Sequence, residues 1–397
     1  MPVPTERWVD ALRAAVRAEL PAAISLRHDL HRHPDLSGLE EATAERVRRA
    51  LGPITGPPVA GTGMLARIGR HDGPAIAVRA ELDALPVTEV TGIPWSASGP
   101  RMHACGHDVH LAALTALCRA ASRPGVELPV AMLAVFQPRE EAYPSGALDI
   151  VSSPDWMAQQ VRAVVGVHVQ PLLAPGAVAA TPGAINAAVC NVEITVTGSG
   201  GHAAYPHVTQ DPVLAISEIV VSLQQAVSRR ISPVNAAVLS IGELRAGTAP
   251  GVIPASAYAA GTLRALNPAD MQTLRDAATE VARAVARAHR CEASVCFELG
   301  EPVLANDERL VSDARDPLTR FGADLAPDLR SCGADDFSYY VQAHPGLMMF
   351  VGTRNIGQAD AVSLHQPAFC PADESVADVT EALIAGFASA TRGASGS

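Results

Sequence analysis

The amino-acid sequence predicts an α/β domain that is interrupted by a smaller α+β domain, and two patterns support this fold class. Nearly continuous apolar runs at 75–78, 130–136 and 163–169 are separated by helical patterns, as expected for strands that are buried on both faces of a sheet. From residue 192 onward, apolar residues instead alternate with polar ones, which is typical of half-exposed strands. The α/β pattern resumes after Pro302.

The inserted domain is predicted from the order of its elements. This order is strand, helix, strand, strand, helix, strand, which is the split βαβ arrangement of ferredoxin-like domains. The segments are a strand at 192–196, a helix at 211–229, strands at 236–244 and 255–263, a helix at 267–290 and a strand at 295–299. With 397 residues the chain exceeds one ordinary domain, so we expect a larger domain in two parts, 1–187 and 302–397, around an inserted domain at 188–301.

Composition and charge narrow the class of protein. Hydrophobic residues make up 48% and charged residues 18% of the chain, as in globular rather than disordered proteins. The net charge of -11 implies an acidic surface that repels phosphate backbones, so we expect no nucleic-acid partner. No apolar run reaches transmembrane length and the N-terminus lacks a signal-peptide pattern, so we expect a cytoplasmic protein without a membrane partner. Seven scattered cysteines, an odd number, predict no disulfide framework.

Two helix starts are predicted from capping residues. Ser37 and Glu40 have the spacing of a capping box, and Gly52 is expected to end the helix that follows them. Asp108 is expected to cap a second helix that runs to about residue 122.

The segment from Met102 to His110 gathers side chains that bind metals. It holds three histidines and one cysteine, and a single glycine separates Cys105 from His107. A thiolate and an imidazole are good ligands for zinc and similar ions. The alternative is a buried cysteine beside surface histidines, and the segment alone does not decide between the two interpretations.

Three further segments carry candidate ligands. Glu140 and Glu141 follow an apolar run, and neighbouring side chains there point in different directions, so one can bind a metal while the other faces an attacking water. His168 lies inside an apolar run and His365 lies near the C-terminus. Each has an ordinary alternative: a solvated acidic pair, a satisfied core histidine and a surface loop residue. Together with the preceding cysteine and histidine they supply five ligands, enough for two metals about 3.5–4 Å apart.

These segments, in this order, resemble the metallopeptidase family that contains aminoacylase, hippurate hydrolase, carboxypeptidase G and the plant indole-acetyl-amino-acid hydrolases. The similarity is greatest to the branch whose first ligands are cysteine and histidine. It covers almost the whole chain, and further similar segments are 27–34, 78–86, 200–207, 252–254, 261–264 and 333–337. The resemblance implies a zinc-exopeptidase-like catalytic domain with a mixed sheet, and an inserted domain that acts as a lid and as a homodimer interface.

The resemblance also implies roles for the candidate site residues. Glu140 is implied to be the general base and acid, and Asp83 is a candidate for orienting a ligand from outside the metal site. The implied cofactors are two divalent ions, with zinc expected first and manganese, cobalt or nickel as alternatives. The implied metal ligands are Cys105, His107, Glu141, His168 and His365.

Other residues are implied to contact the substrate. His202 matches a residue that reaches the scissile carbonyl, and Arg264 matches one that meets a substrate carboxylate; a turn histidine and a structural arginine are the alternatives. The family usually has a glycine-rich stretch after the glutamate pair, whereas this chain has Tyr143 and Pro144, which would stiffen and narrow the rim of the acyl pocket. The family usually has asparagine where this chain has Gly251, so we expect a changed carboxylate site.

The expected function is hydrolysis of the amide bond of an N-acyl amino acid or a related small molecule, by a water that two metals activate. The same site would also serve a dipeptidase, a carboxypeptidase or a carbamoyl-amide hydrolase. The alternative from another class is an inactive member that binds a ligand or a partner protein. It is disfavoured because all five ligands and Glu140 are present.

Overall fold

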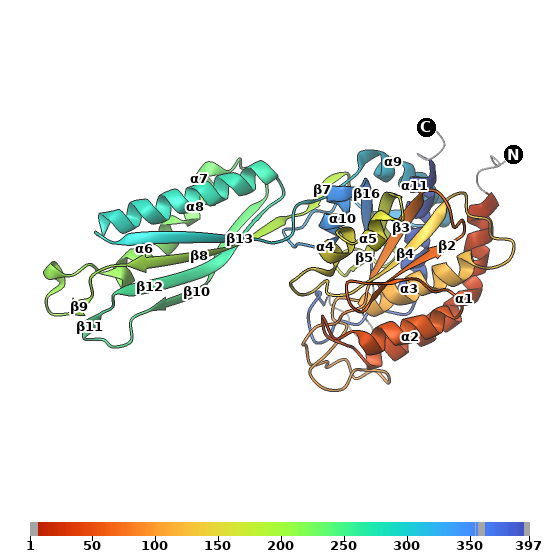
Figure 1. The fold of residues 1–397 in the computed structure, drawn as a ribbon, viewed down its shortest axis with the longest axis horizontal. Helices are drawn as coiled ribbons and strands as arrows, with labels where there is room; N and C mark the ends of the chain where they lie inside the picture. Colours follow the sequence, from red (N-terminus) through yellow and green to blue (C-terminus); the bar gives the residue numbers. More distant parts are fainter. Residues whose placement is uncertain (1–6, 354, 356–361, 393–397) are drawn as a thin grey trace. The chain divides into compact units, whose positions relative to one another are not determined.

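The computed structural model describes residues 7–353, 355 and 362–392, and it divides the chain into two compact units (Figure 1). The second unit contains residues 184–304 and 330–335, and the first contains the rest of the chain. Each unit has its own hydrophobic core.

The segment 330–335 differs from the expected division, which placed it in the larger domain. Backbone pairing explains the difference. The amide of Ser331 donates to the carbonyl oxygen of Ile185 at 2.8 Å, and the amide of Ala187 donates to that of Gly333 at 3.0 Å. The segment therefore extends the second unit, although it lies far from the rest of that unit in sequence.

The first unit is built around a mixed eight-stranded sheet, as the sequence predicts. In spatial order its strands are β1 (Pro58–Val59), β2 (Gly63–Ile68), β4 (Ala131–Gln137), β3 (Ala75–Glu81), β5 (Val161–Gln170), β16 (Gly346–Gly352), β6 (Ala177–Ala179) and β15 (Asp324–Leu325). The central strands β4, β3, β5 and β16 run parallel, whereas β2 pairs with β4 and β6 pairs with β16 in the antiparallel sense. Strands β3, β4 and β16 are buried along their whole length, which explains the apolar sequences of β4 and β16 and the apolar first half of β3.

Helices cover both faces of this sheet (Figure 1). Gly386 of α11 (Glu374–Arg392) packs against Val165 of β5, whereas Phe337 of α10 (Phe337–Ala343) packs against the neighbouring Gly166. Because successive strand residues point to opposite faces, α11 and α10 lie on opposite sides of the sheet. None of the helices in the described ranges is both long and apolar enough to cross a membrane. The other helices of this unit are α1 (Arg7–Arg32), α2 (Glu41–Leu51), α3 (His107–Ala121), α4 (Gly146–Val151), α5 (Pro154–Met157) and α9 (Glu308–Phe321).

The second unit is a four-stranded antiparallel sheet with helices packed on it, and its elements follow the order expected from the sequence. These elements are β8 (Ala188–Thr197), α6 (Pro212–Ser222), α7 (Gln224–Arg230), β10 (Ala237–Ala246), β12 (Ser256–Ala265), α8 (Pro268–Ala288) and β13 (Glu292–Leu299). In β8, Val192, Ile194 and Val196 are buried while the residues between them are not, which is the predicted alternation. Shorter elements of this unit are β9 (Gly201–His202), a 3-10 helix at Pro206–Val208 and β11 (Val252–Ile253). The strands β7 (Gly183–Asn186) and β14 (Leu304–Asn306) each include residues of both units.

The start of α2 differs from the expected capping box. The helix begins after Glu40, whose own side chain makes no capping hydrogen bond, and the carboxylate of Asp35 instead accepts from the amide of Thr43 in the first turn at 2.7 Å. The Ser37 hydroxyl donates to Asp83 instead, and the Glu40 carboxylate accepts from backbone amides outside the helix. The expected end of the helix at Gly52 is confirmed, because the Gly52 amide donates to carbonyl oxygens of the last turn.

The start of α3 also differs from the prediction. The residue at the N-cap is Gly106, so Asp108 lies inside the first turn and does not cap the helix. Oδ2 of Asp108 instead accepts from Nε of Arg27 at 3.1 Å and from Nδ1 of His31 at 3.1 Å. A tertiary partner on α1 therefore replaces the local hydrogen bond that the sequence favoured.

Candidate metal centre

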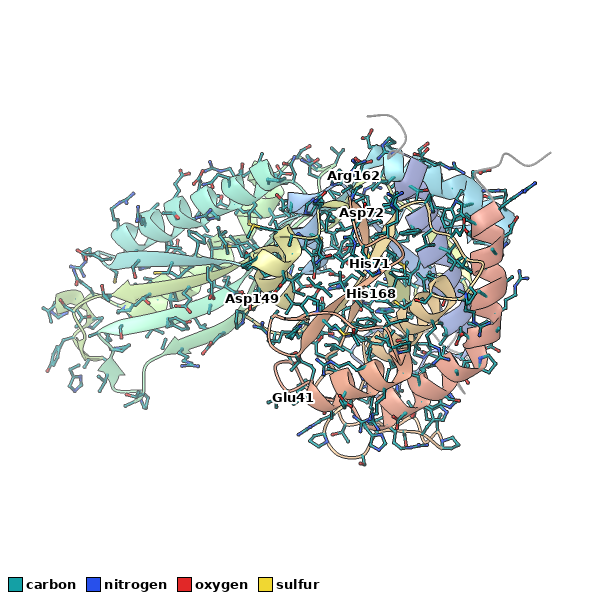
Figure 2. All side chains as sticks on the ribbon, turned by 45° about the vertical axis from the view of Figure 1, so that its right-hand side comes forward. Glu41, His71, Asp72, Asp149, Arg162 and His168 are labelled. Atoms are coloured by element: carbon teal, nitrogen blue, oxygen red, sulfur yellow. The ribbon has the colours of Figure 1, made fainter. Side chains whose placement is uncertain are left out.

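The candidate ligands of the first unit lie at the carboxyl ends of the parallel strands. The supporting residue Asp83 follows β3, and Glu140 and Glu141 follow β4. His168, which is labelled in Figure 2, lies near the end of β5. Parallel neighbours end at the same edge of a sheet, and ligands of open α/β folds bind outside that edge. Cys105 lies in the loop that leads into α3.

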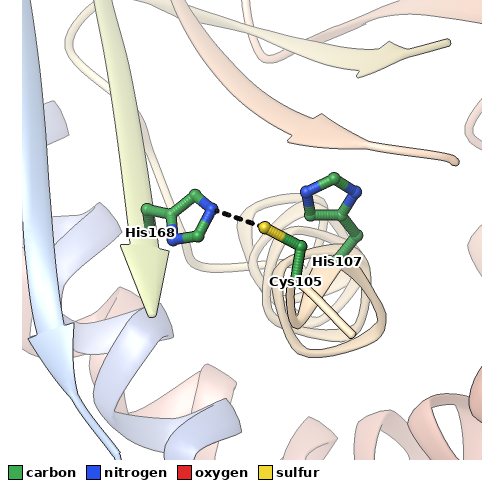
Figure 3. A group of neighbouring side chains, drawn as sticks. All are labelled: Cys105, His107 and His168. Carbon is green, nitrogen blue, oxygen red and sulfur yellow. Dashed lines mark hydrogen bonds between the residues drawn. The ribbon is translucent and has the colours of Figure 1, made fainter. Parts of the chain in front are cut away.

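Gly106 shapes the turn between Cys105 and His107. Its φ is 83°, and a Cβ at this position would lie 2.5 Å from the side chain of Val169. Only glycine fits a left-handed backbone this close to a neighbouring side chain. The turn brings the cysteine and the histidine together at the start of α3 (Figure 3).

Hydrogen bonds to backbone carbonyls orient the two buried imidazoles of the cluster. Nδ1 of His107 donates to the carbonyl oxygen of Asp83 at 2.8 Å, and Nδ1 of His168 donates to that of Val169 at 2.7 Å. Because a carbonyl oxygen only accepts, Nδ1 carries the proton and Nε2 keeps its lone pair in each neutral ring. A backbone carbonyl behind the ring is a common arrangement for histidines that bind metals.

Cys105 is the point at which the candidate ligands converge. Its Sγ lies 3.4 Å from Nε2 of His168 (Figure 3) and 3.3 Å from Nε2 of His365. Nε2 of His365 is also 3.4 Å from Oε1 of Glu141. The backbone amide of His365 donates to the carbonyl oxygen of Ala104 at 2.8 Å, which holds this loop beside the cysteine. All seven cysteines are free, as the sequence predicts, so the Cys105 thiol is available as a ligand.

The ligand atoms form overlapping groups in which all atoms lie within 4.8 Å of one another. Three of these groups contain the predicted ligands: Cys105, His107 and His168; Cys105, Glu141 and His365; and His107, Glu140 and Glu141. The structure thus brings together every residue predicted as a ligand, and it places the predicted base among them.

Two of these ligand atoms are buried without a hydrogen-bond partner. They are Nε2 of His107 and Oε1 of Glu141, and Oδ1 of the adjoining Asp83 is a third such atom. A buried polar atom without a partner costs about 1–3 kcal/mol. A metal ion bound to these atoms would remove that cost, and a set of sulfur, nitrogen and oxygen donors fits zinc and similar ions. The residues therefore fit a metal site.

The charges around the cluster also favour a bound cation. Burial raises the pKa of the Cys105 thiol well above its usual value, and the carboxylates of Glu141 and Glu140 raise it further. Burial alone would lower the pKa of His107, but nearby carboxylates, with Glu81 foremost, outweigh it and raise the pKa. Nearby carboxylates thus contribute to both shifts. A cation between these groups would reverse the effect on the thiol and favour the thiolate.

Asp83 connects several parts of the site. Its Oδ2 accepts from the backbone amide of Glu141 at 2.9 Å and from the hydroxyl of Ser37 at 2.7 Å. Its carbonyl oxygen accepts from His107. The residue thus contacts two candidate ligands from behind, as supporting residues of metal sites do.

A buried polar network behind the cluster was not predicted from the sequence. Nδ1 of His110 donates to Glu81 at 2.9 Å, and Glu81 also pairs with Arg79. Nη2 of Arg79 lies 2.7 Å from Oδ1 of Asp336. A signal for this network was available, because the two-residue spacing of Arg79, Glu81 and Asp83 places them on one face of an extended chain.

His202 and Arg264 lie in the second unit. His202 is exposed, and its Nδ1 accepts from the backbone amide of Ala204 at 3.0 Å. Nη1 of Arg264 donates to the carbonyl oxygen of Cys332 at 3.0 Å. These local contacts do not test the roles expected at the substrate, which stay predictions.

Tyr143 lies in the loop that carries the two glutamates. It is 58% exposed, and its peptide bond to Pro144 is cis. The carbonyl oxygen of Pro144 accepts from Nη1 of Arg139 at 2.9 Å, which holds this part of the loop in place. The expected contact between Tyr143 and an acyl group stays a prediction.

Comparison with known proteins identifies relatives along most of the chain. The model of peptidase family M20/M25/M40 matches residues 77–386. An N-acetylcysteine deacetylase of Bacillus subtilis is 34% identical over 359 residues, which cover 89% of this chain and 92% of the relative. An N-acetyldiaminopimelate deacetylase of Exiguobacterium sibiricum is 33% identical, with 91% of this chain and 97% of the relative covered.

The comparison with solved structures agrees with this result. The crystal structure of a Bacillus subtilis protein, described as a dinuclear metal binding peptidase from the M20 family, matches with a TM-score of 0.81 and 31% identity. The match covers 94% of this chain and 98% of that one, and it confirms the mixed α/β fold. Fold and relatives define a hydrolase that acts on carbon–nitrogen bonds. The chain belongs to peptidase family M20/M25/M40.

Proposed function

We propose that this hydrolase is a metal-dependent amidohydrolase that cleaves the amide bond of a small N-acyl amino acid. The observation that carries the proposal is the convergence of sulfur, nitrogen and oxygen ligand atoms beside Glu140, where His107 and Glu141 each present a buried atom without a hydrogen-bond partner. The relatives named as deacetylases of N-acetylcysteine and N-acetyldiaminopimelate support an acetyl group or another short acyl group on the substrate.

Two divalent ions would be held by the five candidate ligands. Cys105, His107 and Glu141 each belong to more than one of the ligand groups, so the groups share residues. We expect zinc first, with manganese, cobalt or nickel as alternatives. When bound, the ions would supply a water of lowered pKa and positive charge for the developing oxyanion. The ligand residues are Cys105, His107, Glu141, His168 and His365.

Glu140 is the proposed proton carrier. Its Oε2 lies 3.7 Å from Nε2 of His107, so the carboxylate is at the edge of the ligand cluster. It takes a proton from the attacking water and returns it to the leaving amine. Glu141 is directed toward His365, so the two adjacent carboxylates have separate tasks.

Further parts of the proposal rest on the family resemblance alone. They are the roles of His202 and Arg264 at the substrate, and the lid and homodimer functions of the second unit. The contact of Tyr143 with an acyl group rests on its place in the loop of the two glutamates, and the location in the cytoplasm rests on the sequence pattern.

Replacing Glu140 with glutamine tests the proposed base. We expect Glu140→Gln to keep its fold and metal content while kcat falls by about 10²–10⁴-fold, because glutamine cannot accept the proton. The measurements are kcat, KM and bound metal per chain. The control is Glu41→Gln, at an exposed position, which should behave as the wild type. Near-normal turnover by Glu140→Gln would show that another residue is the base.

A substrate panel separates the competing activities. The protein is loaded in turn with zinc, manganese, cobalt or nickel and assayed with acetyl, benzoyl and longer-chain acyl amino acids, carbamoyl amino acids and dipeptides. We expect the highest kcat/KM for a short N-acyl amino acid. A preference for dipeptides would favour a peptidase instead, and fewer than about one bound metal per chain would favour an inactive binding protein.

A further inference from the structure

The loop from Arg139 to Gly146 carries both acidic residues of the candidate site. The amide of Gly146 donates to the carbonyl oxygen of Arg139 at 3.0 Å, which closes the loop. Arg139 has a φ of 51°, in the left-handed region that residues other than glycine rarely adopt. Because Arg139 directly precedes Glu140, the backbone at Arg139 determines where the carboxylate of Glu140 points.

A buried carboxylate from another part of the chain holds this backbone. Glu40 is 0% exposed, and its Oε1 accepts from the amide of Arg139 at 3.0 Å and from the amide of Gly38 at 2.6 Å. Its Oε2 accepts from the hydroxyl of Thr62 at 2.8 Å. A carboxylate that is buried among uncharged donors is costly unless each oxygen is satisfied. Glu40 does not cap α2, so these three bonds are what its carboxylate contributes to the structure.

The side chain of Arg139 holds the middle of the loop. Its Nη1 donates to the carbonyl oxygen of Pro144 at 2.9 Å, and its Nη2 lies 2.6 Å from Oδ2 of Asp149. Arg139 therefore links the start of the loop to its far side. When the backbone of Arg139 is held in place, its side chain starts from the position that allows these two contacts.

The far end of the loop is held independently. Oδ2 of the buried Asp336 accepts from the hydroxyl of Ser145 at 2.7 Å and from the amide of Ala147 at 3.2 Å. With this end fixed, the conformation at Glu140 depends on how the other end is held. That end is held on both sides of Glu140: at the amide of Arg139 by Glu40, and at the amide of Glu141 by Asp83.

We propose that Glu40 is a positioning residue for Glu140, which acts by holding the backbone amide of Arg139. The inference rests on the proposed role of Glu140 as the base. Glu40 contacts the loop backbone rather than the ligand cluster, so its loss should alter the direction of the base and leave substrate binding largely intact. A small displacement of a catalytic group is enough to slow turnover about 10²-fold.

The test compares Glu40→Ala, Glu40→Asp and Glu40→Gln, with Glu41→Ala as the matched control at the exposed start of α2 (Figure 2). Glutamine keeps an acceptor oxygen for the two amides, and its own amide can donate to the Thr62 hydroxyl. Alanine removes the acceptor, and aspartate keeps the charge but shortens the side chain. The measurements are hydrogen exchange in peptides covering residues 138–147, bound metal per chain, and kcat and KM for a good substrate.

In Glu40→Ala and Glu40→Asp we expect exchange within the loop to speed up by about tenfold or more, while exchange elsewhere in the first unit stays unchanged. In the same variants kcat should fall about 10–100-fold, with KM within about threefold of the wild type. Glu40→Gln and the control Glu41→Ala should both keep loop exchange and kcat close to the wild-type values. If the alanine variant does not fold, the aspartate variant is compared with the wild type and with Glu40→Gln.

Wild-type loop exchange in Glu40→Ala and Glu40→Asp would overturn the proposal. Equal defects in Glu40→Gln, or faster exchange across the whole first unit, would overturn it as well, because either would show that Glu40 acts on the fold in general. A wild-type protein that hydrolyses nothing in the substrate panel would instead contradict the proposed function. In that case the exchange measurement alone still decides whether Glu40 holds the loop.

Discussion

Two clusters of charged residues meet at the start of α3, and their negative charge is neutralised in different ways. The arginine cluster consists of Arg27, His31, Asp108 and Asp373, and the ligand cluster consists of Cys105, His107, Glu141, His168 and His365. In the arginine cluster, the guanidinium of Arg27 lies 3.1 Å from Asp108 and 2.7 Å from Asp373. Each cluster has buried atoms without a hydrogen-bond partner: Nε2 of His31 and Oδ1 of Asp108 in the arginine cluster, and Nε2 of His107 and Oε1 of Glu141 in the ligand cluster.

The difference indicates that the arginine cluster mainly stabilises the fold, whereas the ligand cluster is suited to binding a cation. The arginine cluster carries its own permanent cation, so the polypeptide alone can balance the carboxylate of Asp108. The ligand cluster contains carboxylates, imidazoles and a thiol, and a bound cation would neutralise the negative charge of its carboxylates and thiolate. We therefore expect changes in the arginine cluster to alter stability with or without metal, and changes in the ligand cluster to alter stability mainly through metal.

The largest effect is expected from removing the permanent cation. Arg27→Met should lower the free energy of unfolding by about 3–5 kcal/mol, because it leaves buried acidic groups without their guanidinium partner. Chemical denaturation of the metal-free protein measures the loss. Arg49→Met, at a 70% exposed side chain, is the control and should change stability by less than about 0.5 kcal/mol. Similar small values for both variants would mean that the two clusters do not differ in the way described.

The next effect concerns the response to metal. Metal ions at about 100–1,000 times their dissociation constant should raise the free energy of unfolding of the wild type by about 3–4 kcal/mol. Glu141→Gln should lose most of this gain, since it removes a charged ligand. Denaturation with added metal and with a chelator measures both states. In the chelator, Glu141→Gln should resemble the wild type, and a large loss there would show that Glu141 stabilises the fold without metal.

The smallest effect is a pH dependence of the arginine cluster. Burial alone would lower the pKa of His31, but Asp108 and Glu89 raise the pKa to about 9. Because the folded pKa lies above the unfolded value of about 6.5, the stabilisation is complete below about pH 6.5 and is lost as the pH rises through about 9. We expect a decline on the order of 1–3 kcal/mol between about pH 6 and pH 9.5. His31→Gln should flatten this decline, and an equal decline in the variant would exclude His31 as its cause.

The fold was predictable where burial leaves a pattern in the sequence. Strands β3 and β4 are buried on both faces, so the apolar runs at 75–78 and 130–136 revealed them. The short edge strand β15 is exposed and carries no such pattern. The segment 330–335 joins the second unit through backbone hydrogen bonds, which do not require particular side chains and therefore leave no signal.

The residues of the candidate site could be predicted from the sequence, but the contacts that hold these residues in place could not. Cys105, His107 and the glutamate pair stand out because their chemistry and spacing are unusual. Asp108 and Glu40 were interpreted as parts of local helix caps, because a sequence pattern indicates contacts between neighbouring residues but not contacts between distant ones. In the structure their carboxylates bind groups far along the chain, and that choice depends on tertiary packing.

The segment 330–335 also bears on how the protein can be taken apart. The second unit is made of two stretches of chain, so the polypeptide passes between the units four times rather than twice. A fragment that held only residues 184–304 would lack the carbonyl oxygen of Cys332 that Arg264 uses and the backbone partners of Ile185 and Ala187. The second unit is therefore not a cassette that can be excised or transplanted as one continuous piece, and exchanging it between relatives would require both stretches to be moved together.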